Sequence, residues 1–152
     1  MKLASRDGQS LELRILGYQF PHLETEEYDS NWLVVAGKVT HSRGSWQFTN
    51  PCLLTYEAER LASWMDAVAG GKPLPAICDF MEPTLEFRAI FSAQRPVLRV
   101  YFELEARPER ASNERPGKED IWVEFPFEEL NLRSIAREWR GELSAYPQRA
   151  PR

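Results

Sequence analysis

The sequence predicts an α+β domain: a mainly antiparallel β-sheet or sandwich of about seven or eight strands, with two amphipathic helices packed on it. Apolar residues alternate with polar ones in several short segments, short turns join these segments, and only two longer segments have helical spacing. Because strands joined by short turns pair antiparallel, a doubly wound parallel sheet is not expected. The 152 residues, 43% of them hydrophobic, suit a single domain over residues 1–152 with a sizeable core.

The first strand is expected from Gln9 to Tyr18, where apolar and polar residues alternate. A second is expected over residues 30–41. Its segment from Trp32 to Ala36 is apolar at every position, which is typical of a strand buried on both faces, and we assign Trp32 to the core.

A hairpin is expected next. Ser42-Arg43-Gly44 is a turn signal, and Ser45 to Phe48 should run back along the preceding strand. Asn50-Pro51 is expected to end that strand.

A helix is expected to begin at Thr55 as N-cap and to end at Gly70-Gly71. Glu57 and Glu59 lie in its first turn, where the helix dipole favours acidic residues. Its apolar face has the spacing i, i+3, i+4, i+7, formed by Leu61, Trp64, Met65 and Val68.

The second half predicts a short strand at residues 77–80, another over 121–125 and a helix over 132–143. A mobile loop is expected over about 107–120, and fraying from about 147. Two further strands are expected to bury alternate residues, namely Leu85, Phe87, Ala89 and Phe91, and Leu98, Val100, Phe102 and Leu104.

The net charge of −4 does not favour direct, sequence-independent nucleic-acid binding or a polybasic membrane contact, whereas it is compatible with a basic protein partner. The chain has no apolar signal core and no apolar run of the roughly 20 residues that span a bilayer, so we expect a cytoplasmic location. The two cysteines, Cys52 and Cys78, are expected to be buried thiols rather than a disulfide.

No catalytic, cofactor or metal motif is recognised. The two histidines, His22 and His41, have no ligand spacing with acids. Cys52 has apolar neighbours, and burial there would raise its pKa and make it inert. We therefore expect no catalytic residue, no cofactor and no metal.

Four carboxylates are expected on the non-core faces of strands: Glu86, Glu103, Glu105 and Glu124. Three interpretations apply to this face. Paired carboxylates can perform acid/base chemistry, but any solvated antiparallel face has this pattern as well. The third interpretation is a binding face, which Tyr101 and Trp122 favour because exposed aromatic rings among charges suit interface hot spots.

The chain resembles the WapI-like immunity protein family along nearly its whole length. The resemblance rests on the order of aromatic and apolar segments with acidic flanks: LELRILGYQFP (residues 11–21), EYDSNWLVVAGKV (27–39), SWQFTNPCLLTYEAERLASWM (45–65), MEPTLEF (81–87), LRVYFELEARP (98–108) and WVEFPF (122–127). The resemblance implies a small, cytosolic, non-enzymatic protein that binds and neutralises the C-terminal domain of a cognate bacterial contact-dependent toxin, often an RNase. It carries over no site residues.

Two surfaces are candidates for partner binding. The first is an acidic loop with one aromatic ring, which consists of Glu24, Glu26, Glu27, Tyr28 and Asp29. The second is a strand face with Arg99, Tyr101, Glu103, Glu105 and Trp122. Two other functions remain as alternatives, a small enzyme that uses the strand-face carboxylates and a scaffold protein unrelated to toxins. The sequence leaves the oligomeric state open.

Overall fold

The protein is built from two antiparallel sheets of four strands each. The computed structural model describes residues 1–71, 75–92, 94–109 and 121–149. In both sheets the spatial order of the strands is their order in the sequence. Sheet A contains β1 (Lys2–Ala4), β2 (Ser10–Tyr18), β3 (Trp32–His41) and β4 (Gly44–Leu54), and sheet B contains β5 (Ile77–Cys78), β6 (Leu85–Ile90), β7 (Val97–Phe102) and β8 (Ile121–Pro126).

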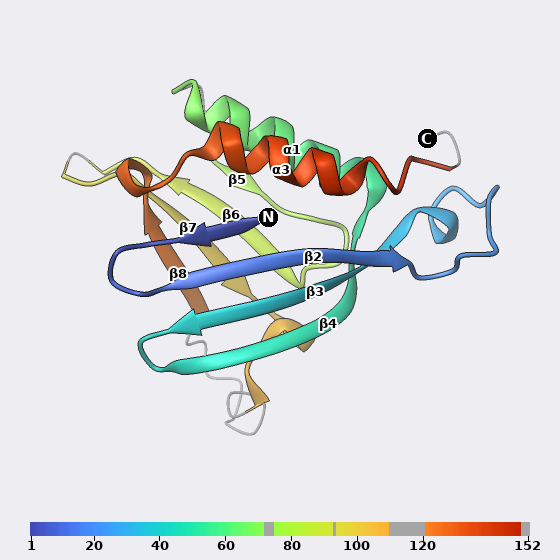
Figure 1. Ribbon diagram of the computed structural model, residues 1–152, viewed down its shortest axis with the longest axis horizontal. Helices are drawn as coiled ribbons and strands as arrows, with labels where there is room; N and C mark the ends of the chain where they lie inside the picture. The colour runs from blue at the N-terminus through green and yellow to red at the C-terminus, as the bar shows by residue number, and fades with distance from the viewer. Residues whose placement is uncertain (72–74, 93, 110–120, 150–152) are drawn as a thin grey trace.

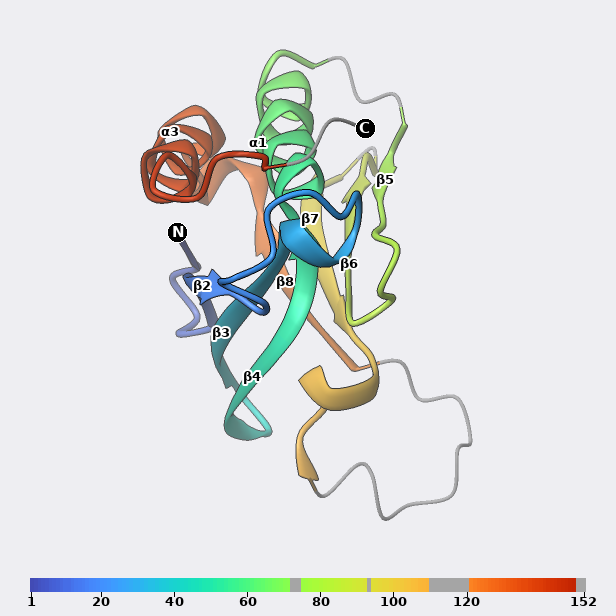
Figure 2. The ribbon, with the colours of Figure 1, turned by 90° about the vertical axis from the view of Figure 1, so that its right-hand side faces the viewer.

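Two helices, α1 (Thr55–Ala69) and α3 (Leu132–Leu143), run side by side and cover one side of the paired sheets (Figures 1 and 2). The helices meet through Trp139, which is fully buried and whose indole Nε1 donates to the carbonyl oxygen of Ala58 at 2.9 Å. The described residues also form three short 3-10 helices: η1 (Asp29–Asn31), η2 (Leu104–Ala106) and η3 (Phe127–Glu129). The predicted α+β class and antiparallel pairing are thus confirmed.

Aromatic rings join the layers of the core. Phe102 of sheet B meets Trp46 and Phe48 of sheet A edge-on, with ring centroids 5.3 and 6.2 Å apart. Trp64 of α1 meets Phe87 of sheet B at 6.4 Å. Offset and edge-on ring pairs of this kind add roughly 0.5–1.5 kcal/mol each beyond their buried area.

Strand β4 is longer than predicted. It continues through Asn50-Pro51 to Leu54, and its register with β3 shifts between Leu33 and Val34. Proline is tolerated here because β4 is an edge strand of sheet A and Pro51 lies beside the register shift, two places where strands accept proline. The prediction that Pro51 ends the strand was therefore wrong.

The start of α1 also differs from the prediction. Leu54, and not Thr55, is the N-cap, and its backbone N–H donates to the Glu57 carboxylate at 3.0 Å. Thr55 is the first helical residue, and its hydroxyl donates to Asn31 Oδ1 at 2.8 Å. The threonine thus ties the helix to the segment before β3.

The outer face of sheet A is only half-buried, contrary to the prediction that both faces of β3 are buried. Leu33 and Val35 point into the core, but Trp32, Val34 and Ala36 are only half-buried. In Figure 1 no described element crosses this outer face. Trp32 therefore lies at the edge of the core and not within it.

Two expected core positions lie beyond the ends of their strands. β6 ends at Ile90, and Phe91 is 49% exposed. β7 ends at Phe102, and Leu104 has a φ of 49° and is 53% exposed. Once the backbone leaves the extended conformation, alternation no longer decides which side is buried.

The loop expected at 107–120 falls largely outside the described residues, since 110–120 are not described. The tail expected to fray from about 147 is hydrogen-bonded as far as the structure describes it. Tyr18 donates its hydroxyl to the carbonyl oxygen of Pro147, and the backbone N–H of Arg149 donates to Asn31 Oδ1 at 3.0 Å.

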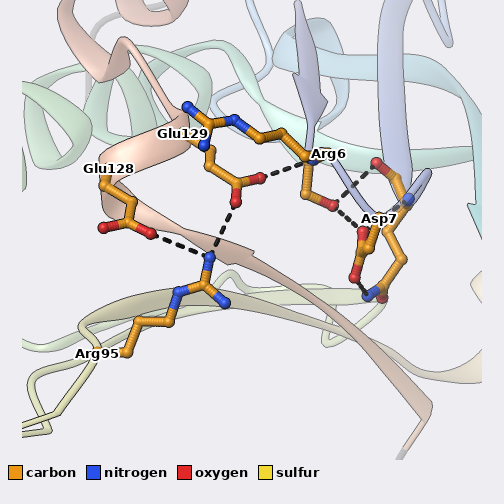
Figure 3. Close-up of polar contacts among 7 residues, drawn as sticks. Arg6, Asp7, Arg95, Glu128 and Glu129 are labelled. Carbon is orange, nitrogen blue, oxygen red and sulfur yellow. Dashed lines mark hydrogen bonds and ion pairs between the residues drawn. The ribbon is translucent and has the colours of Figure 1, made fainter.

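A polar junction joins the β1–β2 turn to sheet B (Figure 3). The carboxylate of Glu129, at the end of η3, accepts from the backbone N–H of Arg6 at 2.7 Å and from Arg95 at 2.9 Å. Arg95 also donates to Glu128 at 3.0 Å. Glu129 therefore bonds at once to the β1–β2 turn of sheet A and to the β6–β7 turn of sheet B.

Candidate partner-binding surfaces

The first candidate surface is the acidic loop, which we define as residues 19–31 between β2 and β3. It protrudes at the end of sheet A where β2 ends and β3 begins (Figure 1). Its neck is closed by the backbone N–H of Gln19, which donates to the carbonyl oxygen of Trp32 at 2.8 Å. The structure exposes all five residues that the sequence singles out, namely Glu24, Glu26, Glu27, Tyr28 and Asp29.

Two buried polar residues hold the second half of the acidic loop. Asn31 donates its side-chain amide to the carbonyl oxygen of Glu27 at 2.9 Å and its backbone N–H to that of Tyr28 at 2.9 Å. Ser30 donates its hydroxyl to the carbonyl oxygen of Glu26. The polar run before β3 is thus divided by role: Ser30 and Asn31 fold the loop, while the acids face solvent.

Arg149 holds the first half of the acidic loop. Its Nη1 lies 3.3, 3.0 and 2.7 Å from the carbonyl oxygens of Phe20, Pro21 and Leu23. Its guanidinium also lies over the ring of Tyr18, 3.5 Å from the centroid. A planar cation stacked on a ring and bonded to carbonyls is a well-suited closure for a loop.

The carboxylates of the acidic loop are not neutralised locally. Within the described part of the chain, no ion pair involves Glu24, Glu26, Glu27 or Asp29. The loop therefore presents four negative charges beside the half-exposed ring of Tyr28. Such a surface attracts a basic partner and repels an acidic one.

The second candidate surface lies on the outer side of sheet B, and we call it the arginine–aromatic face. Register places its side chains in two rows across the strands. Arg88, Arg99 and Glu124 are neighbours in one row, and Glu86, Tyr101 and Trp122 are neighbours in the other.

The rows of the arginine–aromatic face are stacked on each other. The guanidinium of Arg88 lies 4.2 Å from the ring centroid of Tyr101, and that of Arg99 lies 4.1 Å from the ring centroid of Trp122. Arg99 also pairs with Glu124 at 2.7 Å. Tyr101 is only 7% exposed, so the ring expected to face a partner is mostly covered by its arginine neighbours.

Glu105 does not belong to this face, contrary to the prediction, whereas Glu103 continues from β7 in extended backbone and donates its N–H to the carbonyl oxygen of Thr84 at 2.9 Å. The strand ends at Phe102, and Glu105 lies on η2, where it is exposed. Glu103 lies 3.7 Å from Arg107 in an ion pair. The structure thus brings Arg99, Tyr101 and Trp122 together, with Glu103 following Tyr101 on the same alternation, and it places Glu105 outside the face.

Two carboxylates of sheet B, Glu86 and Glu124, are each paired with an arginine. Glu86 is bonded to Arg88, and Glu124 to Arg99, with strand β7 between the two carboxylates. Neighbouring strands lie about 4.8 Å apart, so two carboxylates on alternate strands are about 10 Å apart at the backbone. Each of the two carboxylates is thus bonded to a guanidinium of its own.

The thiols are unreactive by environment. Both cysteines are free and buried, as predicted. Burial raises the pKa of Cys52 to about 12 and that of Cys78 to about 11, so the thiolate is scarce at neutral pH. Among the described residues, no group of three His, Cys, Asp or Glu side chains is arranged to hold a metal ion.

Sequence reasoning missed Arg149 and Asn31, the two residues that set the shape of the acidic loop. Arg149 lies in a Pro- and Arg-containing tail with no periodicity, and its partners are more than 100 positions away. Asn31 adjoins the predicted strand and has no pattern that distinguishes it from a surface residue. Pairings of this kind have no local signal.

The fold and these surfaces define an α+β protein that presents one exposed acidic loop and one self-paired strand face. The family model for the immunity protein WapI-like family matches residues 2–147, and the chain belongs to this family. A search of curated proteins and a search of solved structures each return no match. In the described ranges, no helix combines the length and apolar character needed to cross a membrane.

Proposed function

We propose that this protein binds the C-terminal domain of a cognate bacterial toxin in the cytoplasm and blocks it without any catalytic step of its own. Membership of the immunity protein WapI-like family carries this proposal, because the family as a whole indicates immunity to a toxin through binding of a toxin protein. The toxin domain of this proposal acts on nucleic acid, as an RNase does, and therefore has a basic substrate cleft.

The acidic loop supports the proposal on physical grounds. Its four carboxylates are exposed and lack local ion pairs, so their field reaches a basic partner with little loss to intramolecular partners. The loop is also held at both ends, so little conformational entropy remains to be lost on binding. We assign the toxin contact to this loop.

The arginine–aromatic face is the second contact in this proposal. Tryptophan and arginine are common among residues that dominate interface energetics, and Trp122 is half-exposed. The charges of this face are already paired with one another, so it adds little long-range attraction. It fits a role in close packing after the loop has made the first contact.

The test is co-purification with the toxin domain encoded beside this gene, together with rescue of growth in cells that express that domain. Glu24→Lys, Glu26→Lys and Glu27→Lys together should lower the association rate about tenfold at low salt, and less at high salt. Glu138→Lys is the control for a single reversal, because Glu138 is exposed on α3. A folded wild-type protein that neither binds nor rescues growth contradicts the proposal.

A further inference from the structure

Arg149 contacts both ends of the acidic loop at once. Its guanidinium meets the carbonyl oxygens of Phe20, Pro21 and Leu23, while its backbone N–H meets the side chain of Asn31. The shape of the loop therefore depends on a residue more than 100 positions away along the chain.

The segment around Arg149 is itself anchored, so the bridge has a fixed base. The rings of Tyr146 and Tyr18 meet edge-on with centroids 5.7 Å apart, and Tyr18 donates its hydroxyl to the carbonyl oxygen of Pro147. Tyr18 is the last residue of β2, so this anchor belongs to sheet A. The guanidinium of Arg149 lies over the same Tyr18 ring.

We propose that residues 146–149 form a latch that fixes the acidic loop in one conformation, with Arg149 as its positioning residue. The part of this inference that concerns toxin affinity rests on the function proposed above. The latch itself does not, because it is a property of the free protein. A partner that binds the latched loop finds its carboxylates already in place.

Hydrogen exchange of the free protein tests the latch directly. The backbone N–H groups of Leu23, Ser30 and Asn31 are bonded within the loop, at 3.1, 3.3 and 2.9 Å. Arg149→Ala should raise their exchange rates at least about tenfold, while the amides at the centre of sheet A keep their rates. Arg137→Ala is the matched control, since Arg137 is exposed on α3 and equally charged.

Two further variants separate the contributions of Arg149. Arg149→Lys keeps the backbone bond to Asn31 and a cation near the carbonyls but loses the flat stack, so loop exchange should rise by less than in Arg149→Ala. Tyr18→Leu removes the ring beneath the guanidinium and should also raise loop exchange. Wild-type loop exchange in Arg149→Ala overturns the latch.

Toxin binding by Arg149→Ala distinguishes an electrostatic role of Arg149 from a positioning role, because the two roles predict opposite changes in affinity. Arg149→Ala removes a positive charge beside four negative ones, so electrostatics alone predicts faster association with a basic toxin. The latch instead predicts dissociation faster by about tenfold and weaker binding overall. Faster loop exchange with unchanged or tighter binding would separate the loop from the toxin contact and leave immunity intact.

Discussion

Glu57 is a buried carboxylate whose two oxygens serve different partners. One accepts from the backbone N–H of Leu54 at 3.0 Å and the other from that of Met81 at 2.8 Å, while Arg60 lies 3.7 Å away. The residue is only 5% exposed. It therefore joins the start of α1 to the segment before β6.

Glu57→Gln should lower the free energy of unfolding by about 1–3 kcal/mol, because a glutamine amide turns an N–H toward one of these two donors and leaves it unpaired. Glu59→Gln in the same helix is the control, since its ion pair with Arg140 is half-exposed and worth at most about 1 kcal/mol. Urea unfolding measures both. Equal losses of unfolding free energy would contradict the larger contribution expected from the two buried hydrogen bonds of Glu57.

The thiols give a prediction with a pH dependence. Because burial raises the pKa of Cys52 from 9.0 to about 12, the stability that comes from keeping it neutral is fully present below pH 9 and is lost as pH rises from 9 toward 12. The same holds for Cys78, whose pKa burial raises to about 11, so its contribution to stability is lost as pH rises from 9 toward 11. A thiol reagent at pH 8 should therefore label both cysteines rapidly only in denaturant, and fast labelling of the native protein would contradict their burial.

For single residues, the sequence predicts solvent exposure better than it predicts side-chain contacts. The charges of the acidic loop were expected at the surface and lie there, because short acidic residues among turn formers have no apolar alternative. Tyr101 was expected to be exposed, but its ring is covered by Arg88 of the neighbouring strand β6 and by Arg99 of its own strand. The contact with Arg88 depends on strand register, which the sequence around Tyr101 does not specify.

Gly37 in β3 is required by a close approach between neighbouring strands. A Cβ placed on it would lie 2.1 Å from the ring of Phe48, its partner on β4. The ring fills the space that a side chain would need. Gly141 in α3 has nothing within 4 Å of such a Cβ.

Gly37→Ala should therefore destabilise the protein by about 1–3 kcal/mol, because the Phe48 ring must leave its place in the core. Gly141→Ala should stabilise it by about 0.4–1 kcal/mol, because alanine restricts the unfolded chain and favours the helix. Thermal unfolding of the two variants compares the same substitution with opposite expected signs. Stabilisation by Gly37→Ala would contradict the packing described for the hairpin.

The elements themselves were largely predictable, but some of their ends were not. Alternation identified the long strands, and the helical spacing identified α3 with its bounds, Leu132–Leu143. The ends of β4 and β7 were misplaced because Pro51 is tolerated at an edge and Leu104 adopts a left-handed backbone. Both depend on what lies beside the chain in space and not on local propensity.

At the scale of the whole molecule, Glu129 links the turns of the two sheets. Its side chain is 8% exposed, whereas that of Glu128 is 66% exposed, although both bond to Arg95. Glu129 alone also accepts from the backbone of Arg6 (Figure 3). The two adjacent glutamates thus differ in burial and in the parts of the fold that they join.

Glu129→Ala should lower the free energy of unfolding by about 1–3 kcal/mol, because it leaves the N–H of Arg6 and one donor of Arg95 without their acceptor. Glu128→Ala should cost at most about 1 kcal/mol, as expected for an exposed ion pair. Chemical denaturation of both variants at the same salt concentration measures the difference. A larger loss from Glu128→Ala would place the junction elsewhere.

The overall architecture was predicted only as a class. Antiparallel sheets with two packed helices follow from the periodicity, but the division into two sheets of four strands does not. The distant contacts, such as Arg149 with the acidic loop and Glu129 with the β1–β2 turn, also have no signal in the sequence. They arise from how the layers meet, which is decided by packing across the whole core.

The sequential strand order has a consequence for how the protein is made. Sheet A is complete at Leu54, and sheet B begins only at Ile77. All strands of sheet A therefore emerge from the ribosome before any strand of sheet B. At about 5–20 residues per second, the inner face of sheet A waits several seconds for its cover. The helix α1 is the next element to be synthesised and the first that can shield that face. Synthesis therefore produces sheet A first, then α1, and then sheet B.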